Sequence, residues 1–203
     1  MIVLMSAFLL LSAFSCGGGN KANSTSEQSE ETAVNVPQFD ADSAYLYVKN
    51  QVDFGPRVPN TKEHVACGNY LAGQLEAFGA QVTNQYADLI AYDGTLLKAR
   101  NIIGSYKPES KKRIALFAHW DTRPWADNDA DEKNHHTPIL GANDGASGVG
   151  ALLEIARLVN QQQPELGIDI ILLDAEDYGA PQFYTGQHKE EFWCLGSQYW
   201  ARN

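Results

Sequence analysis

The predicted sheet centres on two apolar runs, KRIALFA at residues 112–118 and IDIILL at residues 168–173. Nearly continuous apolar runs of this length are typical of strands that are buried on both faces of a sheet. Between them, apolar residues recur at helical spacing over residues 149–159, and Pro164 lies beyond the last of them. A strand, a helix and a parallel strand in this order predict an α/β layered domain.

Further elements are predicted before this unit. Helical periodicity and strand-like runs predict two helices and then two strands, at residues 44–52, 67–78, 81–88 and 96–105. Gly79 stands where a C-terminal glycine cap of the second helix belongs. The expected fold is therefore a mixed, mostly parallel central sheet flanked by helices, in one domain at residues 39–203.

Composition limits the classes of partner. The chain has 203 residues, of which 44% are hydrophobic and 20% charged, so it can bury the core of one ordinary globular domain. Its 15 Lys and Arg against 25 Asp and Glu give a net charge of -10, which argues against a nucleic-acid partner. Because there are three cysteines and no Cys-x-x-Cys pair, any metal is expected on oxygen and nitrogen ligands.

The N-terminus carries MIVLMSAFLLLSAFS at residues 1–15, an uncharged apolar stretch too short to span a bilayer comfortably, which we interpret as a signal peptide. Because it runs directly into Cys16 and three glycines, it resembles a bacterial lipoprotein signal with Cys16 as the lipidated residue. An ordinary secretory signal is the alternative. Both predict export, and the first predicts a periplasmic or outer-membrane lipoprotein that meets the membrane only through its lipid. The polar residues up to 38 contain no aromatic side chain, so residues 16–38 are expected to be a flexible tether.

Acidic and imidazole side chains follow the predicted strands. His119 and Asp121 come after the first run, Asp144 precedes the next helix, and Glu176 and Asp177 follow the second run. Taken singly, each is ordinary: a strand-end histidine, an Asn-Asp-Gly turn and a solvated acidic loop. Because open α/β sheets place their sites at the carboxyl ends of strands, the three clusters together predict a zinc site with oxygen and nitrogen ligands.

Five stretches also carry a family resemblance. They are FGPRVPNTKEHVACGNYLAGQLEAFGAQV (54–82), FAHWDTRPWAD (117–127), GANDGASGVGALLEIAR (141–157), IILLDAEDYG (170–179) and CLGSQYWA (194–201). Their order resembles the zinc-dependent M28 peptidase superfamily, and within it most closely the bacterial glutaminyl-peptide cyclotransferases, or glutaminyl cyclases. The resemblance covers nearly all of the predicted domain.

The resemblance implies roles for the strand-end residues. Asp144 corresponds to the aspartate zinc ligand, and Asp177 to the second carboxylate ligand, which is Glu in many relatives. Glu176 corresponds to the catalytic acid and base. The counterpart of His119 binds a second metal in the two-zinc aminopeptidases and is generally unligated in the cyclases, with Asp121 at the position that orients it.

The function implied is zinc-dependent cyclisation of an N-terminal glutamine to pyroglutamate with release of ammonia, on peptide or protein N-termini. One zinc ion suffices for that reaction, whereas the alternative, a two-zinc M28 aminopeptidase, needs a metal-activated water. A second alternative is a non-catalytic binding module of the same fold. Trp120, Trp125 and Tyr178 are candidates for a substrate pocket, although core packing explains each equally well.

Some of the family pattern is expected to be missing. The family continues past Asn203 with a final zinc-binding histidine and a further catalytic aspartate, so we expect a C-terminally truncated domain with an incomplete metal shell and exposed apolar surface. His188 follows the acidic pair but lies in a polar loop, so we expect it to be exposed to solvent. His135 and His136, which are adjacent to each other in another polar loop, are also expected to be exposed. The sequence leaves open whether Cys67 and Cys194 pair.

Overall fold

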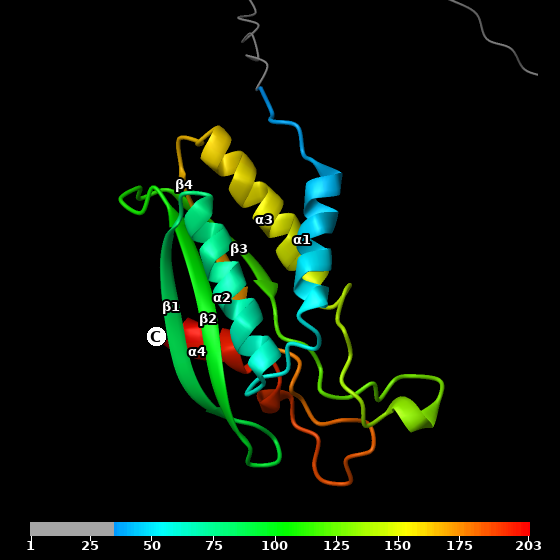
Figure 1. Cartoon of the computed structure of the whole chain (residues 1–203). Helices are drawn as coiled ribbons and strands as arrows, with labels where there is room; N and C mark the ends of the chain where they lie inside the picture. The colour runs from blue at the N-terminus through cyan, green and yellow to red at the C-terminus, as the bar shows by residue number, and fades with distance from the viewer. Residues whose placement is uncertain (1–34) are drawn as a thin grey trace, which may run out of the picture. The chain divides into compact units, whose positions relative to one another are not determined.

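The computed structural model describes residues 35–203, so the predicted signal peptide, Cys16 and most of the tether lie outside the described residues. The described chain forms a four-stranded sheet with four helices (Figure 1). In chain order the helices and strands are α1 (Ala41–Asp53), α2 (Lys62–Ala77), β1 (Gln81–Ile90), β2 (Leu96–Tyr106), β3 (Arg113–His119), α3 (Ala146–Gln161), β4 (Gly167–Leu173) and α4 (Leu195–Arg202). Two short 3-10 helices, Glu132–Asn134 and Glu190–Phe192, lie in the long loops.

The sheet is mixed, with strand order β1-β2-β4-β3. β3 and β4 are parallel, whereas β1 with β2 and β2 with β4 are antiparallel. The mixed sheet flanked by helices is therefore confirmed, but parallel pairing does not predominate among the described strands. The physical reason is the short turn between β1 and β2, which reverses the chain directly and so makes the two strands antiparallel neighbours.

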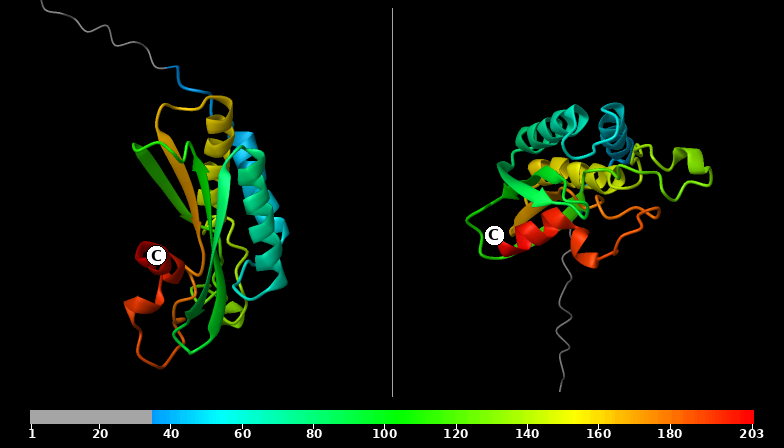
Figure 2. Two further views of the ribbon diagram at one scale, coloured as in Figure 1. Left: turned by 90° about the vertical axis from the view of Figure 1, so that its left-hand side faces the viewer. Right: turned by 90° about the horizontal axis from the view of Figure 1, so that it is seen from below.

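Helices cover both faces of the sheet. α1, α2 and α3 lie on one face, and α4 lies on the other (Figure 2). The main core fills the space between the first three helices and the sheet, and fully buried members include Leu71, Ile102, Leu153 and Ile170. α3 supports the parallel pair, since it contacts β3 and β4.

Local sequence explains where the helices begin and end. The Asp40 side chain accepts the N–H groups of Asp42 and Ser43 at the start of α1, and Thr61 caps α2 in the same way. Gly79 has φ +80° and ends α2, as its position predicts. Within residues 35–203, every helix is too short or too polar to cross a bilayer.

The two apolar runs differ in burial. β4 is buried along nearly its whole length, as predicted. β3 is not, because it stands at the edge of the described sheet with one neighbouring strand, and the prediction of burial on both faces is wrong for it. Ile114 and Phe117 are 48% and 46% exposed, although Phe117 packs edge-on against Trp200 of α4. Exposed apolar surface is thus present at this edge.

Candidate metal and catalytic site

The parallel pair brings the predicted site residues to one end of the sheet. His119 is the last residue of β3 and pairs in register with Leu173, the last residue of β4. Asp144 lies just before Gly145, the residue that caps α3. Glu176 follows β4 after a short turn, so the loops that carry these side chains all gather at the lower end of the sheet in Figure 1.

The turn Asp174–Asp177 is held through all four of its backbone N–H groups. The Asp174 N–H donates to Asn101 Oδ1 at 2.9 Å, and the next N–H donates to Asp174 Oδ1 at 2.7 Å. The N–H groups of Glu176 and Asp177 donate to the two carboxylate oxygens of Asp121, each at 3.1 Å. Asp121 is completely buried, so its charge is stabilised by these two bonds.

The carbonyl groups of the same turn are bonded as well. The carbonyls of the first three residues of the turn, 174 to 176, accept hydrogen bonds at 3.0 to 3.1 Å. The donors are the backbone N–H groups of Gly196, Leu195 and Cys194, in that order. The carbonyl of Asp177 accepts from Arg123 Nη1 at 3.2 Å. Because the start of α4 and the loop after β3 clamp this turn, the positions of the Glu176 and Asp177 side chains follow from a fixed backbone.

His119 joins Asp144 rather than Asp121. Its Nε2 lies 2.7 Å from Asp144 Oδ1, whereas its Nδ1 is 3.5 Å from Asp121 Oδ1 and forms no hydrogen bond. Nδ1 is also 3.8 Å from Glu176 Oε2. Burial lowers the pKa of His119, but Asp121, Glu176 and Asp144 outweigh it and raise the pKa to about 9. In this geometry the Asp121 carboxylate accepts hydrogen bonds from the Glu176 and Asp177 backbone and none from His119.

Asp177 and Asp144 line one pocket of about 260 Å³, together with Arg123 and Trp125. The Asp177 carboxylate is buried, and its Oδ2 atom has no hydrogen-bond partner. Burial and the nearby carboxylates, with Asp121 foremost, raise the pKa of Asp177 to about 7, although Arg123 opposes the shift from 3.6 Å. A buried carboxylate oxygen without a donor is costly, and a cation in the pocket would satisfy it.

These residues fit part of a zinc ligand set. Zinc binds carboxylate oxygen, and Asp144 and Asp177, which line the same pocket, supply it. Among residues 35–203, no three His, Cys, Asp or Glu side chains are gathered closely enough to hold one ion.

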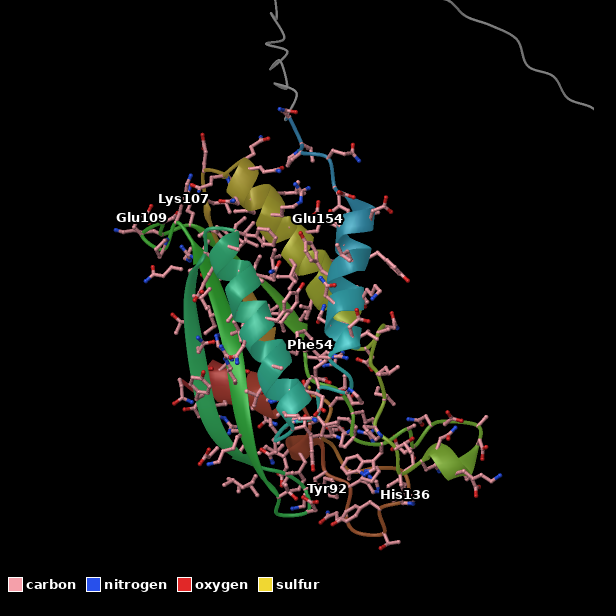
Figure 3. All side chains as sticks on the ribbon, in the orientation of Figure 1. Phe54, Tyr92, Lys107, Glu109, His136 and Glu154 are labelled. Carbon is pink, nitrogen blue, oxygen red and sulfur yellow. The ribbon has the colours of Figure 1, made fainter. Side chains whose placement is uncertain are left out.

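The predicted aromatic residues occupy different places. Trp125 lines the pocket, and Tyr178 packs edge-on against it at 5.3 Å between ring centroids. Trp120 does not line this pocket, because it is completely buried and stacks on His64. The loops that carry Tyr92 and His136 lie at the same end of the sheet as the candidate site (Figure 3).

The remaining histidines and cysteines are also placed. Within residues 35–203, His136 and His188 are exposed as predicted, whereas His135 is half-buried and meets the backbone oxygen of Asp129 at 2.9 Å. Cys67 and Cys194 are both free, so they do not pair. Cys194 instead places its Sγ 3.2 Å from Glu176 Oε1, a contact that the sequence did not predict.

Arg123 is the other site residue missed by sequence reasoning. It is 7% exposed, and its guanidinium forms two hydrogen bonds of 2.6 Å to the Asp127 carboxylate. It also donates to the backbone oxygens of Asp177, Gly179 and Ala180. The arginine thus ties the loop after β3 to the loop after β4, and the only sequence signal for it is its place four residues before an aspartate.

Comparison with known proteins identifies the family. Residues 101–203 match peptidase family M28, which is just over half of the chain. The chain belongs to peptidase family M28. A glutaminyl cyclase of Bacteroides thetaiotaomicron, solved with N-acetylhistamine, is 95% identical to this M28 chain, with a TM-score of 0.83 over 83% of the chain and 58% of that structure.

Two further solved structures are similar to this M28 chain. A Zn-dependent exopeptidase of Parabacteroides distasonis is 63% identical, with a TM-score of 0.81 over 83% of the chain and 57% of that structure. A glutaminyl cyclase of Tannerella forsythia is 58% identical, with a TM-score of 0.80 over 81% of the chain and 56% of that structure. The chain therefore spans somewhat more than half of the length of these relatives.

Proposed function

We propose that the protein converts an N-terminal glutamine of peptides into pyroglutamate with release of ammonia. The observation that carries the proposal is the 95% identity to the glutaminyl cyclase of Bacteroides thetaiotaomicron. The 58% identity to a second glutaminyl cyclase supports it. Asp144 and Asp177 line one pocket, and Glu176 precedes Asp177 in the turn that Asp121 holds, so the site supplies the acidic groups that such a reaction needs.

In this proposal Glu176 moves the proton. The substrate α-amine bonds to the γ-carbonyl carbon, the bond from that carbon to the amide nitrogen breaks, and Glu176 carries the proton lost by the amine to the departing ammonia. The bound turn Asp174–Asp177 keeps the Glu176 backbone still during this transfer. Cys194 and His119 approach the two oxygens of its carboxylate at 3.2 and 3.8 Å.

Asp144 and Asp177 are the residues that would hold the metal, and similarity to a Zn-dependent exopeptidase supports zinc as that metal. When bound, zinc would polarise the γ-carboxamide oxygen as a Lewis acid, and one ion suffices for this reaction. The bond from His119 to Asp144 fixes the direction of that carboxylate. Trp125 supplies an apolar wall for the first residues of a peptide substrate.

A two-zinc aminopeptidase is the second candidate, because one relative at 63% identity is named an exopeptidase. Mass spectrometry of the full-length, zinc-loaded protein with a Gln-initiated and a Leu-initiated peptide separates the two. Loss of ammonia from the first peptide supports the cyclase. Release of leucine from the second supports the peptidase, and the absence of both products supports a binding module.

We also propose that the protein is exported and anchored by a lipid on Cys16. The support is the sequence alone, in which an apolar 15-residue stretch leads directly into Cys16. Metabolic labelling with a fatty acid in a bacterial host tests this. Label that disappears in the Cys16→Ser variant supports the anchor, whereas an unlabelled but processed protein supports an ordinary secretory signal.

A further inference from the structure

His64 is a buried histidine that reaches the site from the side of α2. It is 3% exposed, and its Nε2 lies 2.9 Å from both carboxylate oxygens of Asp174, the first residue of the turn that carries Glu176 and Asp177. Because an ionised carboxylate only accepts, Nε2 is the donor. A helix distant in sequence therefore touches the base of the candidate catalytic turn.

The buried carboxylate of Asp174 is stabilised by the hydrogen bond from His64. Its carboxylate is completely buried and also accepts the N–H groups of Arg100 at 2.6 Å and of Ala175 at 2.7 Å. Burial raises the pKa of Asp174, and the hydrogen bond from His64 opposes that shift. Of the three groups that donate to this carboxylate, His64 is the side chain and the others are backbone amides. Removing it leaves a buried carboxylate with unfilled acceptor positions, which favours a shift of the turn.

The same imidazole also contacts the other strand end. It stacks on Trp120 with 4.3 Å between ring centroids and 17° between planes. Trp120 lies between His119 and Asp121 in the sequence. Its backbone N–H donates to the carbonyl of Leu173 at 3.0 Å. One side chain of α2 thus packs against the segment after β3 and bonds the segment after β4.

The approach of α2 at this point is close and specific. A Cβ atom added at Gly68, one turn after His64, would lie 3.0 Å from the Trp120 ring and 3.3 Å from Arg100 Nη1. At this point α2 therefore packs directly against the Trp120 and Arg100 side chains.

We propose that His64 is a positioning residue, which acts through Asp174 and Trp120 to hold the Asp177 carboxylate and the Glu176 carboxylate at the metal and substrate pocket. The inference rests on the proposed function in that it takes these two residues as metal ligand and proton carrier. A histidine that only stabilised the core would lower the melting temperature without a separate effect on zinc.

The test uses the full-length protein and a matched pair of amide substitutions. In His64→Gln the amide nitrogen stands close to the position of Nε2 and can still donate to Asp174, whereas in His64→Asn it stands nearer to Nδ1 and cannot reach. Leu71→Ala, in the same helix and equally buried, is the control for general destabilisation. Zinc affinity is measured by competition with a chelator, well below the melting temperature of every variant.

We expect His64→Asn to weaken zinc binding by about tenfold, because the turn that carries the proposed ligand Asp177 loses a side-chain bond at its first residue, and to lower kcat with little change in KM. His64→Gln should recover most of the affinity, and Leu71→Ala should lower only the melting temperature. Zinc affinity of His64→Asn equal to that of Leu71→Ala, or no recovery in His64→Gln, would overturn the proposal. If the wild type cyclises no peptide, the proposed function fails while the zinc comparison still decides the role of His64.

Discussion

A single buried carboxylate, Asp121, fixes the two residues on which the proposed chemistry depends. Its oxygens accept the backbone N–H groups of Glu176 and Asp177, so both side chains leave a backbone that cannot easily move. His119, next but one in sequence, bonds Asp144 instead. The site is therefore assembled by strand-end segments that hold one another, and this leaves the Glu176 side chain free to exchange protons.

Replacing Glu176 by Gln in the full-length protein tests the proton transfer. We expect kcat for Gln-initiated peptides to fall by roughly 100- to 10,000-fold, because an amide cannot take a proton from the amine. Zinc content should not change, since Glu176 is not an expected ligand. Glu191→Gln, an exposed residue in the loop before α4, is the control and should keep full turnover. Wild-type turnover in Glu176→Gln would remove the proton carrier from the mechanism.

The sequence could place these residues but not their partners. Strand periodicity and the loop after β3 were enough to predict that His119, Asp144 and the Glu176–Asp177 pair share one end of the sheet. The bond from His64 to Asp174 spans 110 residues of sequence, and those from Asp121 to the turn span about half as many. Periodicity predicts on which element and face a side chain lies. It does not predict which hydrogen-bond donor from a distant part of the sequence lies next to that side chain in the folded protein.

Among the elements, the contact between α1 and α3 depends on the small size of Gly150. A Cβ atom there would lie 2.6 Å from Val48 Cγ2 and 2.9 Å from the backbone oxygen of Ala44. We expect Gly150→Ala to destabilise the protein by about 1–3 kcal/mol. The cost of the steric overlap is expected to exceed the gain of about 1 kcal/mol that alanine gives in helix propensity. The midpoint of urea unfolding measures it.

Gly73 provides the matched control for that substitution. It lies on the exposed side of α2, and a Cβ atom there would meet nothing within 4 Å. Gly73→Ala should therefore stabilise the protein by roughly 0.5–1 kcal/mol. Equal effects of the two substitutions would mean that the approach of α1 to α3 is looser than the structure has it.

Glu154 makes the same contact sensitive to pH. Its buried carboxylate accepts two bonds from Arg157 and the N–H of Asp40, at the start of α1 (Figure 3). The bonds from Arg157 lower the pKa of Glu154. A lowered folded pKa favours the ionised form in the folded state, so its stabilisation is complete above the unfolded pKa and disappears as the pH falls through the folded value.

The Glu154→Gln variant should thus be less stable than the wild type by about 1–3 kcal/mol at pH 7, and the gap should narrow below about pH 4. Urea unfolding at pH 7, 5 and 3 measures it. Asp53→Asn, which removes an exposed ion pair with Lys49, should change stability by at most about 0.5 kcal/mol at any pH. A gap that stays constant from pH 7 to 3 would show that the charge of Glu154 is not the cause.

Periodicity predicted every described strand and the helices α1, α2 and α3, and most of their ends lie within three residues of the predicted ones. The exception is the start of α2, which begins at Lys62 and not at residue 67. The burial of β3, by contrast, could not be predicted from its sequence. Its apolar composition predicts a strand covered on both sides, whereas its burial depends on whether a further strand and helix lie beside it. That is a property of tertiary neighbours, which the run itself does not encode.

At the scale of the whole molecule, the described α/β layers form a frame that presents carboxylates at one end. Three helices and the core lie on one face of the sheet, and the loops after β3 and β4 meet beyond its end (Figures 1 and 2). The chain spans 56% to 58% of the length of the two glutaminyl cyclases compared above. Four aspartates of the described residues line the pocket, with Asp144 and Asp177 among them. Zinc would then link the loop before α3 to the loop after β4.

Removing the metal tests that link. Zinc that binds only the folded protein stabilises it by about 2.7 kcal/mol at 100 times the Kd, so the melting temperature of the metal-free, full-length protein should rise when zinc is added. Asp144→Ala should abolish the rise, because a proposed ligand is lost. Asp129→Ala alters an exposed residue that lines the same pocket and should leave the rise unchanged, which controls for a general effect of negative charge. If Asp144→Ala responds to zinc as the wild type does, the ion binds elsewhere, and Asp144 serves only to hold His119.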